Sequence, residues 1–255
     1  MSGVYLSVVI PSYNETENLK RGVLNEVRDY LAKQSYSWEV IVIDDESPDE
    51  EARNLARIFC EQNGGFRFIQ AKHQGKVGSI WTGVQAAMGE CVLFTDMDQS
   101  TPIVEIEKLL PYFSKGLDVV IGSRGLERKK FSLPRQLASF VFRNFRRAVL
   151  LREIIDTQAG FKLAKTAVVK EVFPLLSVVE HMGEAKGWSP GSWDVEYLVA
   201  VKVRGYKIAE VTVSWEDRDV AVGKKGNSKF VKESIGMLKE VFLVKYYQLC
   251  GRYKK

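Results

Sequence analysis

The sequence predicts an α/β fold with a mostly parallel central sheet, helices on both faces and a C-terminal amphipathic helix. Across residues 6–122, short apolar runs of β-strand character alternate with stretches whose apolar residues recur at helical spacing. The strand-like runs do not alternate between polar and apolar residues, which indicates strands that are buried on both faces. A repeated strand–helix order of this kind favours parallel pairing, because each helix carries the chain back across the sheet.

The elements follow from these patterns in chain order. Strands are expected over residues 6–10, 39–43, 66–70, 91–95 and 117–122. Helices are expected over residues 15–33, 49–62, 78–87 and 102–113. Asp49 is a candidate N-cap for the second of these helices, and Pro102 opens the fourth.

The strand–helix rhythm breaks after residue 124. Helices are expected over residues 134–151, 165–173, 193–203 and 228–249, and a late strand over 208–214. We expect one domain over residues 1–227 and a basic amphipathic C-terminal helix over 228–255. The helices at 134–151 and 228–249 combine apolar and basic residues, which suits either contact with an anionic membrane surface or core packing with a solvated basic rim.

Charge and composition limit the location and the partners. The net charge of +5 is uneven: residues 124–152 hold nine Lys/Arg against one acid, and residues 224–255 hold nine against two. Such asymmetry favours contact with an anion. No apolar run reaches the length of a membrane span, and the three cysteines form no disulfide framework. We therefore expect a cytoplasmic protein, peripheral on the membrane, with a membrane-anchoring partner as a further candidate.

Two pairs of acids follow expected strands: Asp44 and Asp45, then Asp96 and Asp98. The carboxyl ends of parallel strands meet at the edge of the sheet where ligands bind. Carboxylates spaced i and i+2 supply the hard oxygen ligands that Mg²⁺ or Mn²⁺ prefers. The alternative is a solvated loop with two turn-forming aspartates.

Basic residues supply two further candidate sites. Residues 72–78 lead into a helix with a glycine-containing turn that suits either a phosphate cradle or a plain turn, and Lys76 lies within it. Arg124 follows the fifth strand, and four arginines lie downstream at Arg135, Arg143, Arg146 and Arg147. The guanidinium fork fits phosphate oxygens, so this run favours anion contact.

The ordered motifs resemble those of family-two inverting glycosyltransferases, which have the GT-A fold. The motifs are Val-Ile-Pro-Ser-Tyr-Asn-Glu at 9–15, Val-Ile-Asp-Asp-Glu-Ser-Pro-Asp at 42–49 and Asp-Met-Asp at 96–98. Further matches at 122–124, 156–162, 193–196, 208–215 and 226–229 resemble the polyprenyl-phosphate branch, with dolichyl-phosphate glucosyltransferases first and mannosyltransferases next.

The resemblance implies a role for each matching residue. A nucleotide pocket is implied at Pro11, Tyr13, Glu15 and Asp45. Asp44, Lys76 and Asp96 are added to it as candidates from their positions after the strands and in the glycine-containing turn. Metal ligation is implied at Asp96 and Asp98, with Ser100 in the place where the mannosyl branch often has glutamine. Acceptor or donor phosphates are assigned to Arg124, Arg135, Gln158, Arg218, Ser228 and Lys229. Asp194 or Glu196 is assigned to sugar hydroxyls, or to ordering the loop.

The implied reaction is metal-dependent, inverting transfer of a hexose from a nucleotide sugar to dolichyl or polyprenyl phosphate at the cytoplasmic membrane face. Asp98, Arg124, Arg135 and Arg218 are the expected catalytic residues. UDP-glucose is the favoured donor, with GDP-mannose and UDP-N-acetylglucosamine as alternatives. A same-fold transferase acting on a hydroxyl acceptor is a rival. Nucleic-acid binding is disfavoured, because the acidic sheet edge repels phosphates and no nucleic-acid motif is present.

Overall fold

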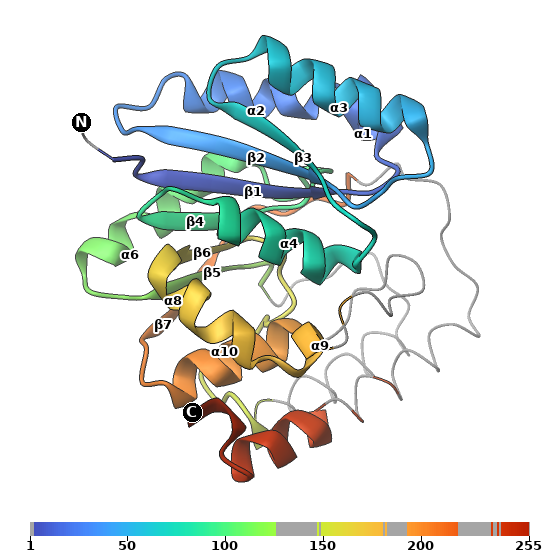
Figure 1. The fold of residues 1–255 in the computed structure, drawn as a ribbon. Helices are drawn as coiled ribbons and strands as arrows, with labels where there is room; N and C mark the ends of the chain where they lie inside the picture. Colours follow the sequence, from blue (N-terminus) through green and yellow to red (C-terminus); the bar gives the residue numbers. More distant parts are fainter. Residues whose placement is uncertain are drawn as a thin grey trace, which may run out of the picture.

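The structure is a computed structural model that describes residues 3–125, 147, 149–180, 182, 193–218, 236, 239 and 241–254. Within them, the chain forms a seven-stranded sheet of order β3-β2-β1-β4-β6-β5-β7. The first four strands run parallel: β1 (Leu6–Ser12), β2 (Trp38–Asp44), β3 (Phe66–Gln70) and β4 (Cys91–Phe94). Helices lie on both sides of this sheet (Figure 1). The predicted α/β architecture is therefore confirmed.

One strand reverses the direction of the sheet. β6 (Lys162–Lys165) runs antiparallel to both of its neighbours, β4 and β5 (Val119–Ser123). β7 (Ile208–Thr212) then pairs parallel with β5 at the edge of the sheet. Sequence analysis did not predict β6, and its insertion brings the turn that precedes it next to the end of β4.

The two faces of the sheet carry separate cores because successive side chains of a strand point to opposite faces. Val9 packs into one core, whereas Val8 and Ile10 pack into the other. The first core is covered by α4 (Gly75–Ala86), α8 (Thr166–Val172) and α10 (Trp193–Val203). The second is covered by α2 (Val23–Leu31), α3 (Glu50–Gln62), the 3₁₀ turn η1 (Ile103–Glu105) and α5 (Ile106–Leu109).

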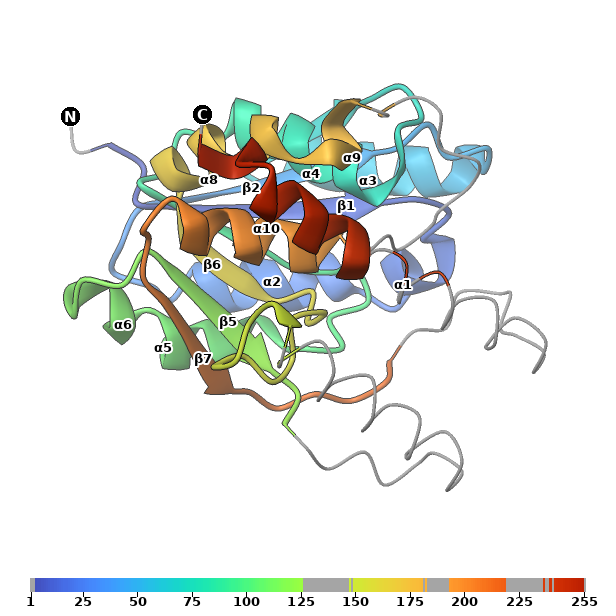
Figure 2. The same cartoon turned by 90° about the horizontal axis from the view of Figure 1, so that it is seen from below.

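Short elements complete the described chain. They are α1 (Thr16–Lys20), α6 (Pro111–Ser114), η2 (Phe173–Leu175), α9 (Ser177–Glu180) and η3 (Arg252–Lys254). The view from below places α9 and the C-terminal segment on the α10 side of the sheet (Figure 2).

Most helix predictions hold, but the single helix expected over 102–113 is divided into η1, α5 and α6. The side chain of Asp49 accepts a hydrogen bond from the amide of Glu51, which confirms it as the N-cap of α3. The single helix expected over 15–33 is wrong, because the chain breaks between α1 and α2. Gly22 has φ of 85° at this break, a left-handed conformation that ends a helix.

The C-terminal segment is helical over residues 241–249. Val241 and Val244 are buried, and Val244 joins the core that α10 covers. Most of the expected helix at 134–151, and residues 228–235 of the last one, lie outside the described residues.

Candidate active site

Three loops leave the sheet at the carboxyl ends of β1, β2 and β4. Each holds a non-glycine residue with positive φ: Asn14 at 56°, Glu46 at 55° and Gln99 at 48°. Residues other than glycine rarely adopt this backbone conformation, and residues strained in this way are concentrated at functional sites. Ligands of open α/β sheets also bind at this edge. The strained loops therefore mark the carboxyl edge as the candidate site.

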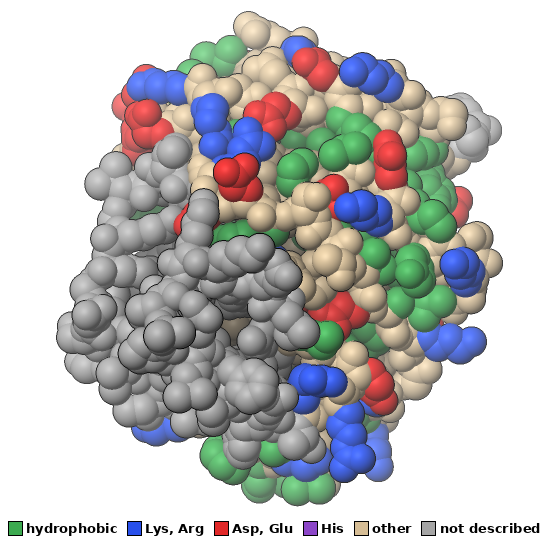
Figure 3. Space-filling model, turned by 180° about the vertical axis from the view of Figure 1, so that it is seen from behind, with side chains coloured by type: hydrophobic (Ala, Val, Ile, Leu, Met, Phe, Trp, Pro, Cys, Tyr) green, Lys and Arg blue, Asp and Glu red, His purple; other side chains and the backbone are tan. Residues whose placement is uncertain are grey.

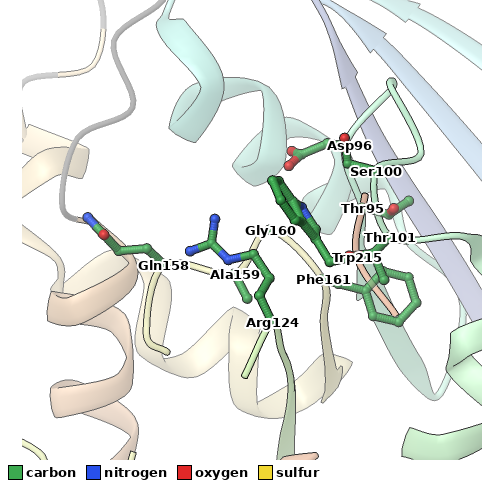
Figure 4. A pocket seen from close by; sticks show the side chains of 10 residues that line it. All are labelled: Thr95, Asp96, Ser100, Thr101, Arg124, Gln158, Ala159, Gly160, Phe161 and Trp215. Carbon is green, nitrogen blue, oxygen red and sulfur yellow. The ribbon is translucent and has the colours of Figure 1, made fainter. Parts of the chain in front are cut away.

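A pocket opens at this edge, as Figure 4 shows. Four segments build it: the loop after β4, the residue after β5, the turn before β6 and the run after β7. Its lining residues are Thr95, Asp96, Ser100, Thr101, Arg124, Gln158, Ala159, Gly160, Phe161 and Trp215. In Figure 4 the Asp96 carboxylate and the Arg124 guanidinium lie on either side of the Trp215 ring. The pocket thus combines an acid with a cation, as a site for a metal and for phosphate groups requires.

Asp96 lies in the first position of the Asp-Met-Asp motif and forms an ion pair with Lys76 of α4. Burial opposes ionisation of Asp96, but the positive charges of Lys76, Lys162 and Arg124 together outweigh it and lower the pKa of this carboxyl below its ordinary value. The same pair raises the pKa of Lys76, although burial acts in the opposite direction. Both groups are therefore charged at neutral pH.

Asp98 and Ser100 are held within the loop after β4. The Asp98 carboxylate accepts a hydrogen bond from the Ser100 amide at 2.8 Å, while Arg21 donates to the Asp98 carbonyl at 2.7 Å. The Ser100 hydroxyl accepts from the Arg218 amide at 3.2 Å. Arg21 and Arg218 therefore fix this loop from two directions, and the contact of Arg21 was not anticipated from the sequence.

The chemistry of this loop fits a divalent cation. Asp96 and Asp98 supply two hard carboxylates, and the buried Oε1 of Gln99 has no hydrogen-bond partner among the described residues. No cluster of three or more His, Cys, Asp or Glu side chains arises in the described part of the chain. Any further ligands would then come from neutral oxygens such as that of Ser100, from water or from a bound phosphate.

Arg124 is oriented by Asp156. Its guanidinium donates two hydrogen bonds to the carboxylate, from Nε at 2.7 Å and from an Nη at 2.8 Å. Its guanidinium carbon also lies 5.7 Å from the centre of the Trp215 ring. Glu210 of β7 accepts from the Asp156 amide at 2.8 Å, which anchors the acid itself. Arg124 is thus held rigidly at the pocket, and the sequence did not reveal the role of Asp156.

Arg218 contacts the loop after β4, where its guanidinium donates to the Gln99 carbonyl at 3.4 Å. It donates two hydrogen bonds to Glu26 of α2, at 3.0 and 2.8 Å, and these bonds lower the pKa of the glutamate. The remaining expected phosphate ligands, Arg135, Ser228 and Lys229, lie outside the described residues. Gln158 lines the pocket beside Arg124.

The loop after β2 meets the start of α4. Asp45 is fully buried, and its carboxylate accepts from the amides of Gln74 and Gly75 at 2.8 and 2.9 Å. His73 Nδ1 lies 2.8 Å from the same carboxylate, and the His73 ring lies 5.2 Å from that of Tyr13. Asp45 therefore ties the second strand to the glycine-containing turn that the sequence singled out.

The other residues of the expected nucleotide pocket have local partners. Asp44 is fully buried and accepts from both the amide and the hydroxyl of Ser47. Glu15 accepts from the Asn18 side chain at 2.6 Å. Pro11 is buried at the penultimate position of β1, just before the strained loop at Asn14. Asp44 thus stabilises the turn after β2, whereas Tyr13 and Asp45 lie where that turn meets the start of α4.

A buried lysine that sequence analysis did not assign contacts the turn that lines the pocket. Lys162, at the start of β6, is fully buried and pairs with Asp194 of α10 and with the Ala159 carbonyl. Its ammonium also lies 5.5 Å from the centre of the Trp193 ring. Lys162 is the last residue of the Asp-Thr-Gln-Ala-Gly-Phe-Lys motif at 156–162. Its place in that motif was the feature of the sequence from which a role at the site could have been predicted.

The two acids expected at the sugar have different surroundings. Burial raises the pKa of Asp194, and Lys162 and Lys76 act against that rise. Glu196, two residues further along α10, accepts from the amide and hydroxyl of Ser177 and from the Tyr253 hydroxyl. The structure therefore places Asp194 close enough to Lys76 and Asp96 to interact with their charges. Glu196 instead connects α10 to α9 and to the C-terminal segment.

Comparison with known proteins gives the family. Residues 7–173 match the model of "Glycosyl transferase family 2". The chain belongs to this family. The glycosyltransferase is 30% identical to the dolichyl-phosphate beta-glucosyltransferase of Saccharomyces cerevisiae, over 98% of this chain and 77% of the relative. The human protein of the same name is 31% identical, over 83% of this chain and 67% of the relative.

Solved structures confirm the GT-A fold of this glycosyltransferase. The glucosyl-3-phosphoglycerate synthase of Mycobacterium tuberculosis, solved with Mn²⁺, UDP-glucose and phosphoglyceric acid, superposes with a TM-score of 0.64. Its sequence is 16% identical, and the match covers 95% of this chain and 80% of that one. A mannosyltransferase from Pyrobaculum calidifontis, solved with GDP-Man and Mn²⁺, gives 0.56 at 18% identity, over 90% of this chain and 60% of that one.

Proposed function

We propose that this glycosyltransferase transfers glucose from UDP-glucose to dolichyl or a related polyprenyl phosphate, with inversion at the anomeric carbon and with help from Mg²⁺ or Mn²⁺. One observation carries the proposal: Asp96 and Arg124 line the same pocket in a chain similar to dolichyl-phosphate beta-glucosyltransferases. The acid suits the donor side of such a reaction, and the arginine suits an acceptor that is itself a phosphate.

The chemistry requires little from a general base. The second pKa of a phosphate monoester is near 6, so the acceptor is largely a dianion at pH 7. One of its oxygens forms the new bond to the anomeric carbon, while the bond from that carbon to UDP breaks and UDP leaves with the electron pair. No proton has to be removed, in contrast to transfer to a hydroxyl.

The residues of this chain position the reactants. Arg124, held by Asp156, presents a fixed guanidinium to the acceptor phosphate, with Gln158 beside it. Asp96 and Asp98 would hold the divalent ion, which when bound neutralises the charge that develops on the departing diphosphate. Asp194, paired with Lys162, is our candidate for contact with the sugar hydroxyls. Alignment of this kind supplies much of the rate of a transfer reaction.

A donor panel tests the reaction. Purified protein is incubated with a polyprenyl phosphate, Mn²⁺ and UDP-glucose, GDP-mannose or UDP-N-acetylglucosamine, and the lipid product is scored by mass. We expect product from UDP-glucose, and we expect both chelation by EDTA and Asp98→Ala to abolish it. Product from GDP-mannose alone would reassign the donor. Transfer only to a hydroxyl acceptor would overturn the proposal.

We also propose that the C-terminal segment contacts an anionic membrane surface, on the cytoplasmic face. No helix in the described part of the chain has the length and apolar character of a membrane span. Helix 241–249 instead exposes a stripe of apolar side chains: Phe242, Leu243, Tyr246 and Leu249. Residues 241–255 contain four Lys/Arg and no acid. Figure 3 shows hydrophobic and basic side chains together at the lower end of the molecule. An apolar stripe within a basic segment suits anionic headgroups.

Flotation with vesicles tests the membrane contact. The protein should float with vesicles that contain an anionic phospholipid, and high salt should weaken the association. Replacing Phe242 and Leu249 with serine should reduce flotation, whereas Met88→Ser, an exposed apolar residue elsewhere, should leave it unchanged. The original protein could instead form a dimer and fail to float with the vesicles. If the double substitution then dissociates that dimer, the apolar stripe is an interface with a second copy of the chain.

A further inference from the structure

We propose that Lys76 is a resident counter-ion of Asp96 that couples binding of the divalent cation to binding of the nucleotide diphosphate. In the absence of ligands the Lys76 ammonium is paired with the Asp96 carboxylate. When the cation and the nucleotide diphosphate bind, the ammonium moves to the diphosphate. The inference rests on the proposed function, because it takes Asp96 as a ligand of the cation. It adds a specific role for Lys76 that nucleotide contact alone does not include.

The first support is the contact itself. The Lys76 ammonium pairs with Oδ1 of Asp96, and the two side chains are 18% and 40% exposed. A cation that uses this carboxylate must therefore displace, or share the carboxylate with, an ammonium already bound there. Two positive charges on one carboxylate repel each other, so the lysine opposes the binding of the cation when nothing else takes up its charge.

The second support is the way the backbone of Lys76 is fixed. Lys76 lies in the first turn of α4, where Asp45 accepts hydrogen bonds from the amides of Gln74 and Gly75. Gly75 has φ of 74°, which lets the chain turn sharply into the helix. The base of the lysine side chain is therefore held in place, and its four-carbon stem lets the ammonium move between neighbouring anions.

The third support is the charge balance around the pocket. Lys162 pairs with Asp194 and Arg124 pairs with Asp156, and neither of these acids lies in the Asp-Met-Asp loop. Lys76 pairs with an acid of that loop, so it is the partner that loses its anion when a cation binds there. A diphosphate brought in with the cation supplies new oxygens for the ammonium.

The consequence is positive coupling between the two ligands. UDP should raise the affinity for Mn²⁺ by compensating Lys76, and by linkage Mn²⁺ should raise the affinity for UDP by the same factor. Coupling between two ligands is about 5- to 150-fold in typical cases. Removing the ammonium should strengthen Mn²⁺ binding in the absence of UDP and reduce the coupling factor.

Calorimetric titration of Mn²⁺ into the full-length protein, with and without saturating UDP, tests the proposal. For Lys76→Met we expect Mn²⁺ to bind about 10-fold more tightly without UDP, and the coupling factor to fall by about 10-fold. Lys76→Arg, which keeps the charge, should retain most of the coupling. Lys33→Met, at an exposed lysine just after α2 and outside the candidate site, is the matched control and should behave as the unsubstituted protein. Equal thermal midpoints check that the variants are folded.

The outcomes separate the inference from the proposed function. If Lys76→Met and the unsubstituted protein bind Mn²⁺ with the same affinity and coupling, while Asp96→Asn loses binding, the counter-ion role of Lys76 is wrong and the cation site stands. If the unsubstituted protein binds no Mn²⁺ even with UDP, both proposals are wrong. Should Lys76→Met weaken Mn²⁺ binding without UDP, Lys76 supports the site directly and the inference is also overturned.

Discussion

The carboxylate of Asp96 lies directly against the backbone of Gly160: a Cβ added to the glycine would come within 2.2 Å of Oδ2. Gly160 belongs to the turn before β6, 64 positions along the chain from Asp96. This close approach explains why glycine is needed at that position in the pocket. The glycine has no positive φ, so its role depends on space and not on backbone conformation.

Gly160→Ala is therefore expected to reduce activity without unfolding the protein. The new methyl group would displace the Asp96 carboxylate from its position, and a displacement of about 1 Å can cost roughly 100-fold in rate. Steady-state kinetics and thermal unfolding measure the two effects. Gly64→Ala, at a glycine with open space around its Cα and no positive φ, is the control. Equal activity of both variants would show that Asp96 tolerates displacement.

Asp156→Asn should reduce both stability and activity. The substitution keeps the shape of the side chain but removes the charge that pairs with Arg124 in a largely buried site. Because a charge-assisted hydrogen bond contributes about 1.5–3 kcal/mol, we expect a loss of about 2 kcal/mol in the free energy of unfolding. Urea denaturation measures the loss. Asp29→Asn, which removes the partner of Arg28 from an exposed pair, should change stability by less than about 1 kcal/mol.

Arg218→Ala should lower kcat/KM by at least about 10-fold, whereas Glu26→Gln should have a small effect. The arginine is expected to serve an anionic substrate, but Glu26 is a half-exposed partner in a pair whose contribution to stability is small. The assay uses a range of acceptor concentrations, so that KM and kcat are separated. Equal losses in the two variants would mean that Arg218 acts through Glu26 to hold the Asp-Met-Asp loop.

Asp118 should make stability depend on pH in the acid range. Burial opposes its ionisation, but hydrogen bonds from the Lys165 ammonium at 2.8 Å and the Lys207 amide at 2.9 Å lower its pKa. A lowered folded pKa means that the stabilisation is complete above the unfolded value of about 3.9 and is lost as pH falls through the folded value.

Urea denaturation of the original protein and of Asp118→Asn, at several pH values between about 7 and 3, checks this sign. The variant should be less stable by about 1 kcal/mol at pH 7. That difference should shrink as the pH falls below about 4. A difference that grows with acidity would contradict the assignment, because it would mean that the folded state favours the protonated carboxyl.

Local pattern was sufficient for most of the fold. The buried strands and the helices α3, α8 and α10 were predicted close to their observed bounds, because their apolar residues follow the period of the element. The break at Gly22 and the strand β6 were missed. The apolar pattern continues across Gly22, and β6 has four residues with a lysine at each end, so its identity as a strand depends on pairing with β4 and β5.

The sequence by itself determined the family motifs, the acids that end the strands and the arginine after β5, since each is readable from residue type and order. The tertiary structure decided which charges meet: Lys76 with Asp96, Arg124 with Asp156 and Lys162 with Asp194. These partners are 20 and 32 positions apart in the sequence. Sequence spacing carries no information about such contacts, because the sheet order and the antiparallel β6 bring the segments together.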